Sequence, residues 1–199
     1  MGSAKTLLQM AGASPVPPPL GESAVVVIDA QNEYLDGRLP LPGVEPALAT
    51  IARLLARARA AGAPVIHVAH VGKAGGLFDP DARGGRICDA VKPEGGEAVV
   101  GKGLPNSFAG TELQTTLKAI GRPNLVLVGF MTHMCVSSTA RAALDLGWRT
   151  TVIADATATR PLPDPTGGDD LDAAILQRAS LAELGDRFAT VVNLDGLPG

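Results

Sequence analysis

The chain has 199 residues, a formal net charge of -3 and only two cysteines. This length suits one α/β domain with a substantial core, while the mild negative charge without a basic run argues against a nucleic-acid partner. No stretch approaches the roughly 20 apolar residues of a bilayer-spanning helix, and two cysteines without a signal peptide indicate a reducing compartment, so we expect a cytoplasmic protein that does not bind membranes.

The first elements alternate between strand and helix after a proline-rich start. Residues 1–22, which contain SPVPPPLG, are typical of an N-terminal extension, and residues 23–199 are expected to form one domain. Ala24 to Ile28 is a run of apolar, mostly β-branched residues, which is typical of a central parallel strand. The apolar spacing then predicts a helix over 44–61 and a strand over 64–70.

The second half continues this alternation after a long polar loop over 71–97. The alternation predicts a single-domain, doubly wound (Rossmann-like) α/β sheet, mainly parallel and six-stranded, with helices on both faces. Ligands of such sheets bind beyond the carboxyl ends of the strands. The expected strands are 98–100, 125–128, 150–154 and 189–192, and the expected helices are 111–120, one that follows Cys135, and 170–184.

Cys135 lies where an apolar run breaks at Gly129 and a helix is expected to begin. Backbone N–H groups and the positive end of the helix dipole favour thiolate over thiol at such a position, and the same N–H groups can stabilise an oxyanion. The sequence therefore predicts a nucleophile at this elbow. The alternative is a buried cysteine that serves only as a small apolar side chain.

A carboxylate and a cation occur at two other predicted strand ends. Asp29 follows the first strand, and Lys102 lies on a loop just after the short strand over 98–100. Each has an ordinary alternative, since aspartate is common in turns and lysine on solvated surfaces. With Cys135, however, they supply a base for the thiol proton, a nucleophile for a carbonyl carbon, and a cation for the charges of both.

Four segments, IDAQNEY, KGLPNSF, VGFMTHMCVSSTARAALDLG and VIADATATR, together resemble the isochorismatase-like cysteine hydrolase family. The family includes nicotinamidases, N-carbamoylsarcosine amidases and streptothricin hydrolases. The resemblance implies that Asp29 is the general base, Lys102 the triad lysine and Cys135 the nucleophile. It also implies a cis peptide bond between Phe130 and Met131, which would place the N–H groups of Met131 and Cys135 in an oxyanion hole.

The same resemblance implies a reaction and an assembly. The expected reaction is hydrolysis of a C–N amide-type bond of a small molecule through a thioester, and the expected assembly is a homodimer or homotetramer. Nicotinamidases carry an Asp-x-His pair and a further histidine for a metal, but the segment VIHVAHVGK has His67 and His70 without that aspartate. We therefore expect no metal and no cofactor, with His67 packed in the core and His70 at the crevice.

The substrate pocket is expected to draw on the motifs around the triad. Tyr34 and Phe108 follow two of these motifs closely, and aromatic side chains commonly line small-molecule pockets. The predicted lining residues are Gln31, Tyr34, His70, Phe108 and Thr132.

Two other functions are compatible with Cys135. One is the vinyl ether hydrolysis of isochorismatase itself, which requires protonation of the ether rather than covalent attack. The other is a non-enzymatic binding protein or redox sensor with Cys135 as its oxidisable thiol. A sensor needs no general base, so Asp29 and Lys102 favour the hydrolase. The sequence does not specify the substrate or the leaving group.

Overall fold

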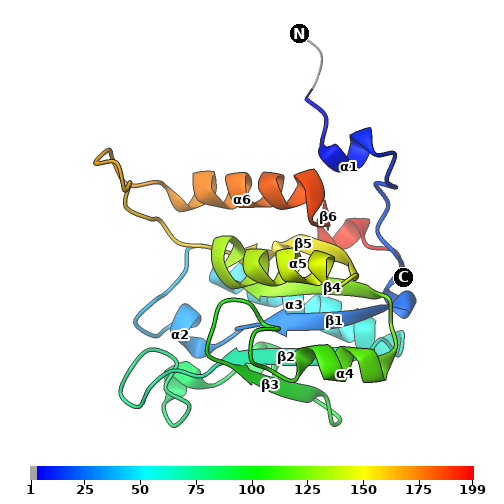
Figure 1. Ribbon diagram of the computed structural model, residues 1–199. Helices are drawn as coiled ribbons and strands as arrows, with labels where there is room; N and C mark the ends of the chain where they lie inside the picture. The colour runs from blue at the N-terminus through cyan, green and yellow to red at the C-terminus, as the bar shows by residue number, and fades with distance from the viewer. Residues whose placement is uncertain (1–3) are drawn as a thin grey trace.

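A computed structural model describes residues 4–199. Six parallel strands form one sheet in the order β3-β2-β1-β4-β5-β6 (Figure 1). The chain order reverses between β1 and β4, which is the switch point where ligands bind in open α/β sheets. The predicted doubly wound fold is confirmed. The strands are β1 (Ser23–Ile28), β2 (Val65–His70), β3 (Ala98–Lys102), β4 (Asn124–Phe130), β5 (Arg149–Ala158) and β6 (Thr190–Val192).

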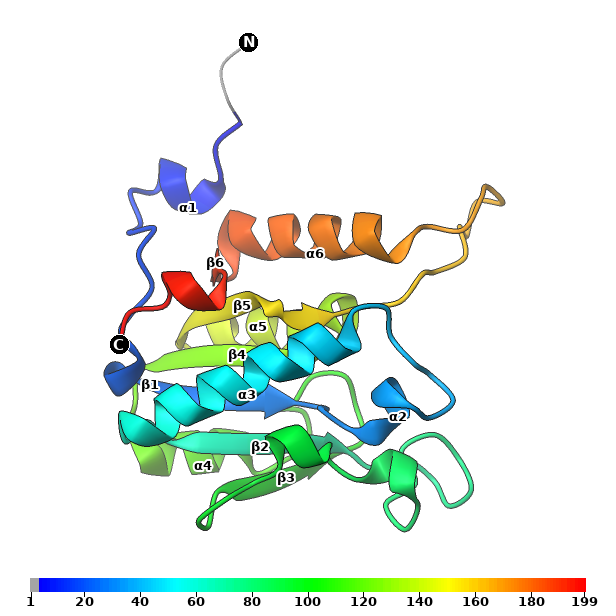
Figure 2. The same cartoon turned by 180° about the vertical axis from the view of Figure 1, so that it is seen from behind.

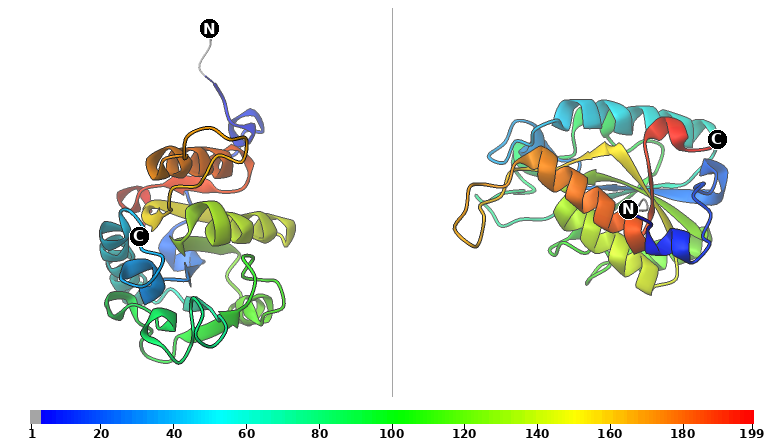
Figure 3. Two further views of the ribbon diagram at one scale, coloured as in Figure 1. Left: turned by 90° about the vertical axis from the view of Figure 1, so that its left-hand side faces the viewer. Right: turned by 90° about the horizontal axis from the view of Figure 1, so that it is seen from above.

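Helices cover both faces of the sheet, as Figures 2 and 3 show. One face carries α3 (Val44–Ala60), and the other carries α4 (Leu113–Ile120) and α5 (Ser137–Asp145). The helix α6 (Ala173–Arg187) lies at the β6 side of the sheet. It begins three residues later than predicted because the Asp172 side chain caps it by accepting from the Ala174 N–H.

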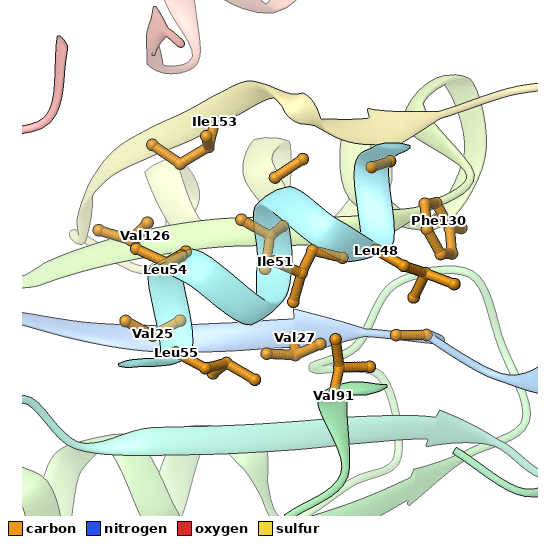
Figure 4. Packing of buried hydrophobic residues seen from close by; sticks show 14 of the residues in the cluster. Val25, Val27, Leu48, Ile51, Leu54, Leu55, Val91, Val126, Phe130 and Ile153 are labelled. Atoms are coloured by element: carbon orange, nitrogen blue, oxygen red, sulfur yellow. The ribbon is translucent and has the colours of Figure 1, made fainter. Parts of the chain in front are cut away.

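The apolar residues of α3 recur at helical spacing, so they lie on one face of the helix and pack on the sheet. Figure 4 shows Leu48, Ile51 and Leu55 of α3 packed over Val25 and Val27 of β1. Each fully buried side chain of this size contributes about 1.5–3 kcal/mol relative to an exposed one. Every residue of β1 is buried. This buried central strand therefore holds Asp29, the residue that follows it, in a fixed position.

Three strands, β3, β4 and β5, extend at least two residues beyond their predicted ends, and the first two of them bear on the site. β3 extends to Lys102, so this lysine ends the strand instead of lying on the following loop. β4 continues through Gly129 to Phe130, with an irregularity in its pairing to β5. Gly129 has φ +110°, and a Cβ there would lie 2.0 Å from the Ile28 carbonyl oxygen. Gly129 does not break the strand; it lets β4 approach β1 closely beside the predicted site.

The short elements outside the alternation were not predicted. They include α1 (Leu7–Met10), α2 (Asn32–Leu35) and several 3₁₀ turns, two of which, η2 (Arg83–Gly85) and η3 (Asp89–Val91), give structure to the long loop over 71–97. Among residues 4–199, no helix is long and apolar enough to cross a membrane.

The N-terminal segment packs on its own chain. The Leu7 N–H donates to the Asp186 carboxylate of α6 at 2.8 Å. Further along, the Leu20 N–H donates to the Pro198 carbonyl at 3.2 Å. The C-terminus therefore lies beside the segment that leads into β1, at the edge of the sheet where β1 starts (Figure 2).

Candidate active site

Three predicted catalytic side chains come together at the carboxyl edge of the sheet. Asp29 follows β1, Lys102 ends β3, and Cys135 lies in a π-helical turn, η4 (Thr132–Val136), between β4 and α5. Lys102 Nζ lies 2.7 Å from Asp29 Oδ2. It also donates to Cys135 Sγ at 3.3 Å and to the Leu104 carbonyl at 3.1 Å. Three separate segments thus converge on one point.

This cluster is shielded from water. The side chains of Asp29 and Lys102 have no exposed surface, and Cys135 is only 5% exposed. Although Nζ is close to Oδ2, neither oxygen of Asp29 has a hydrogen-bond partner of good geometry among the described residues. The close ion pair with Lys102 leaves the carboxylate in place to accept a proton. Buried acceptors without partners are uncommon and typical of catalytic positions.

The protonation of the cluster differs from the sequence prediction. Burial raises the pKa of Asp29, against the opposing charge of Lys102. Burial and then the Asp29 charge raise the pKa of Cys135 to about 12, although Lys102 opposes this. Burial thus opposes the thiolate that the helix end was expected to favour. The π-helical turn places Cys135 before Ser137, where α5 begins.

The cis peptide bond implied by the resemblance joins Phe130 to Met131. It connects the end of β4 to the turn that holds Cys135. The roles of the Met131 and Cys135 N–H groups as an oxyanion hole stay a prediction.

Two predicted pocket residues, Gln31 and Thr132, form hydrogen bonds with the protein backbone. The Gln31 side chain is fully buried and donates to the carbonyls of His70 and Gly85 at 2.9 and 2.8 Å. Its Oε1 accepts from the His70 N–H at 2.9 Å. The buried Thr132 hydroxyl donates to the Ala158 carbonyl at 3.1 Å. Gln31 and Thr132 therefore position the backbone around the site, and their contact with a substrate stays a prediction.

Two other predicted pocket residues, Tyr34 and His70, lie beside the triad. Burial first, then the charges of Asp29 and Cys135, raise the pKa of Tyr34. Burial and the Lys102 charge lower the pKa of His70, which favours its neutral form. Both side chains are thus close enough to the reacting groups to contact a bound molecule.

A phenylalanine that the sequence did not single out completes this wall. The ring of Phe78 lies 5.0 Å from that of Tyr34 and 5.1 Å from that of His70, in edge-to-face geometry. The ring of Phe130 lies 5.9 Å from that of Tyr34. Phe78 comes from the long loop over 71–97, and the only available signal was that the chain has four phenylalanines.

Phe108, in contrast, is not part of this wall. Its ring stacks on Trp148 with centroids 5.4 Å apart and planes 17° apart. Trp148 immediately precedes β5, at the edge opposite the triad. The chain turns away from the site because the Ser107 N–H donates to the Thr139 hydroxyl of α5 at 3.1 Å. The assignment of Phe108 to the substrate pocket is therefore corrected.

The remaining histidines occupy distinct places. His67 is buried, as predicted, and its Nε2 lies 3.0 Å from Glu97 Oε2. The ring of His133 contacts the Thr159 hydroxyl, while His133 Nε2 and Arg160 Nε are buried without a partner among the described residues. Within residues 4–199, no three His, Cys, Asp or Glu side chains are grouped so that they could hold a metal ion.

The fold and the site define a class of protein, a doubly wound α/β protein with a buried Asp–Lys–Cys cluster at the switch point. Within that class, a model of the Isochorismatase domain family matches residues 23–195, and the chain belongs to this family.

Relatives and solved structures agree with this assignment. The chain is 42% identical over 185 residues to the secreted isochorismatase effector Isc1 of Verticillium dahliae, covering 92% of this chain and 94% of that protein. It is 36% identical over 176 residues to a streptothricin hydrolase of Streptomyces noursei, covering 88% of this chain and 64% of that protein.

Among solved structures, an isochorismatase from Pseudomonas putida KT2440 has a TM-score of 0.93 at 40% identity, covering 98% of this chain and all of that one. The N-carbamoylsarcosine amidase of Thermoplasma acidophilum has a TM-score of 0.75 at 28% identity, covering 89% and 99%. The chain is therefore a hydrolase of the isochorismatase family, as the sequence motifs predicted.

Proposed function

We propose that this protein is a cysteine amidohydrolase that cleaves a C–N amide-type bond of a small molecule through a thioester. The observation that supports this best is the position of Lys102 Nζ, 2.7 Å from Asp29 Oδ2 and 3.3 Å from Cys135 Sγ in a buried site. A base, a nucleophile and a cation in this arrangement are what covalent acyl transfer needs. The similarity to a streptothricin hydrolase and to an N-carbamoylsarcosine amidase also favours an amide substrate.

The first half-reaction forms the thioester. Asp29 takes the thiol proton as Cys135 Sγ attacks the carbonyl carbon, because the thiol is protonated at neutral pH. The N–H groups of Met131 and Cys135 receive the negative oxygen, and each such donor is typically worth about 2.7–4 kcal/mol. Protonated Asp29 then donates its proton to the nitrogen as the C–N bond breaks, and ammonia or an amine leaves.

The second half-reaction restores the enzyme. Asp29, again a carboxylate, removes a proton from water as the water attacks the thioester. The C–S bond breaks, protonated Asp29 returns its proton to Cys135 Sγ, and the acid product leaves. Lys102 stabilises the negative charge on Asp29 and on the sulfur during both steps.

The other expectations stay proposals of the same kind. We propose that the enzyme needs no metal or other cofactor, acts as a homodimer or homotetramer, and binds neither nucleic acid nor membranes. We also propose a cytoplasmic location, although the Verticillium relative is named as secreted.

The decisive experiment measures ammonia release from a panel of primary amides, ureides and carbamoyl amino acids. We expect the wild type to turn over at least one class, and Cys135→Ala to lower kcat by at least about 10⁴-fold. Cys88→Ala is the matched control, because Cys88 is the other buried cysteine and lies outside the triad. Absence of ammonia release from every amide, or equal activity of Cys135→Ala, would contradict the proposal.

Vinyl ether hydrolysis is the second candidate, because the 42% identical relative is named an isochorismatase effector. That reaction needs an acid but no covalent nucleophile, and the raised pKa of Asp29 suits an acid. Turnover of isochorismate that persists in Cys135→Ala but is lost in Asp29→Asn would favour this function. Loss in both variants would favour the thioester route.

A further inference from the structure

The catalytic edge is closed, since the side chains of Asp29 and Lys102 have no exposed surface and Cys135 is 5% exposed. A substrate must nevertheless reach Sγ, so part of the covering has to move. We propose that residues 72–79, here called the Phe78 flap, open to admit the substrate, and that the Phe78 ring closes the site and limits the size of the bound acyl group. This inference rests on the function proposed above.

The segment that contains the flap is anchored on both sides. The amide of Gln31 binds the backbone of His70 before the flap and the Gly85 carbonyl after it, at 2.8–2.9 Å. The Val71 N–H also donates to the Lys102 carbonyl at 2.8 Å. These bonds fix the flanks next to the triad. The flap can therefore move without displacing Asp29 or Lys102.

Two backbone N–H groups of the flap donate hydrogen bonds to other residues of the flap. The Gly72 N–H donates to the Phe78 carbonyl at 3.0 Å, and the Gly75 N–H donates to Asp79 Oδ2 at 2.7 Å. A Cβ on Gly72 would lie 1.8 Å from the Leu77 carbonyl oxygen, so glycine is required where the two ends of the flap meet. The flap is thus a compact unit with its own internal bonds.

Phe78 is the main contact between this unit and the site. Its side chain is buried between Tyr34 and His70. Its N–H donates to Glu33 Oε2 at 3.4 Å, which is long for a hydrogen bond. The φ of Phe78 is +55°, a conformation that bulky residues rarely adopt. The packing of one ring therefore holds the closed position against local backbone strain.

The partners of the Phe78 ring explain why it would also select substrates. Tyr34 and His70 are the two wall residues that interact electrostatically with Asp29. The Phe78 ring packs on both of them and therefore lies beside the residues that flank the triad. A larger acyl group must displace that ring, whereas truncation of Phe78 leaves room for it.

The test is the rate of alkylation of Cys135 by iodoacetamide, followed by peptide mass spectrometry, because this readout does not depend on amidase activity. We expect Phe78→Ala to raise the rate constant by at least about tenfold, since it opens access to a buried thiol. Leu77→Ala is the matched control, because Leu77 is the adjacent flap residue and is 41% exposed. It should change the rate by less than about twofold.

Cys88, which is 1% exposed, reports general loosening in the same experiment. An unchanged Cys135 rate in Phe78→Ala would overturn the proposal, and so would a parallel rise at Cys88, because lost packing would then explain the exposure. Phe78→Leu, which keeps an apolar side chain, should give an intermediate rate. If amides are turned over, Phe78→Ala should also shift kcat/KM toward bulkier acyl groups; failure of turnover with a positive alkylation result would contradict only the amidase function.

Discussion

Two carboxylates lie next to β2 and β3, one at each end of these strands: Asp29 is buried, Glu97 is partly buried, and they differ in the hydrogen bonds that they accept. Asp29, with Lys102 at the carboxyl end, has no well-oriented hydrogen bond to either oxygen. Glu97, which precedes β3, accepts from Arg59 through both oxygens at 2.9 Å. It also binds His67 at 3.0 Å and the Glu94 N–H at 2.9 Å.

The two carboxylates therefore have pKa values shifted in opposite directions. Burial raises the pKa of both, but at Glu97 the hydrogen bonds from Arg59, the Glu94 N–H and His67 reverse this and lower the pKa to about 2. At Asp29, the raised pKa persists. The difference shows how a charged group built for structure can be told from one available for chemistry, because the first has its acceptors filled and the second does not.

The largest expected effect separates the two carboxylates by activity. Asp29→Asn should lower kcat/KM by about 10²–10⁴-fold, because the amide cannot transfer the proton. Glu97→Gln should stay within about threefold of the wild type, because it lies at the opposite edge. Steady-state kinetics on any substrate of the wild type would measure both. A loss of similar size in Glu97→Gln would contradict the claim that only Asp29 takes part in the chemistry.

A second prediction concerns stability in acid. The pKa of Glu97 is lowered in the folded state, so its contribution to stability is present above about pH 4.5 and is lost as the pH falls toward about 2. A shift of this size corresponds to about 3 kcal/mol of unfolding free energy. Urea unfolding of the wild type and Glu97→Gln between pH 3 and pH 7 should show a steeper acid loss in the wild type. Parallel curves would contradict the assignment.

A third prediction concerns the Cys135 thiol. Because its pKa is about 12, the rate of alkylation should rise about tenfold per pH unit from pH 7 to 10 without a plateau. Asp29→Asn removes a negative charge that raises this pKa, so its profile should level off at a lower pH. Glu97→Gln should follow the wild type. A plateau below pH 9 in the wild type would show a thiolate at rest.

Local patterns were sufficient for much of this description. The β-branched run of β1 predicted both the strand and the position of Asp29 at its end, because a strand buried on both faces is apolar throughout. The role of Lys102 was first suggested by its place after a predicted strand, and the family resemblance then named it as the triad lysine. Its strand β3 is short and lies at the edge of the sheet. Only some residues of such a strand are buried, so its apolar pattern in the sequence is weak.

The rest depended on contacts between distant segments. Phe78 meets Tyr34 across 44 residues of chain, and no local pattern reports such a contact. Phe108 was misplaced because closeness to Lys102 in the sequence does not fix the direction that the loop takes after Ser107. The protonation of Cys135 depends on its depth of burial, which helical periodicity does not reveal.

The way the C-terminus is held against the rest of the chain has a practical use. Leu20 binds the Pro198 carbonyl, and the Arg57 guanidinium binds the carbonyls of Leu194 and Leu197 at 2.9 and 2.6 Å. The C-terminus is thereby held at the edge of the sheet where the strands start (Figure 2). A protein immobilised through Gly199 on a sensor chip would present its reactive edge to the flowing solution.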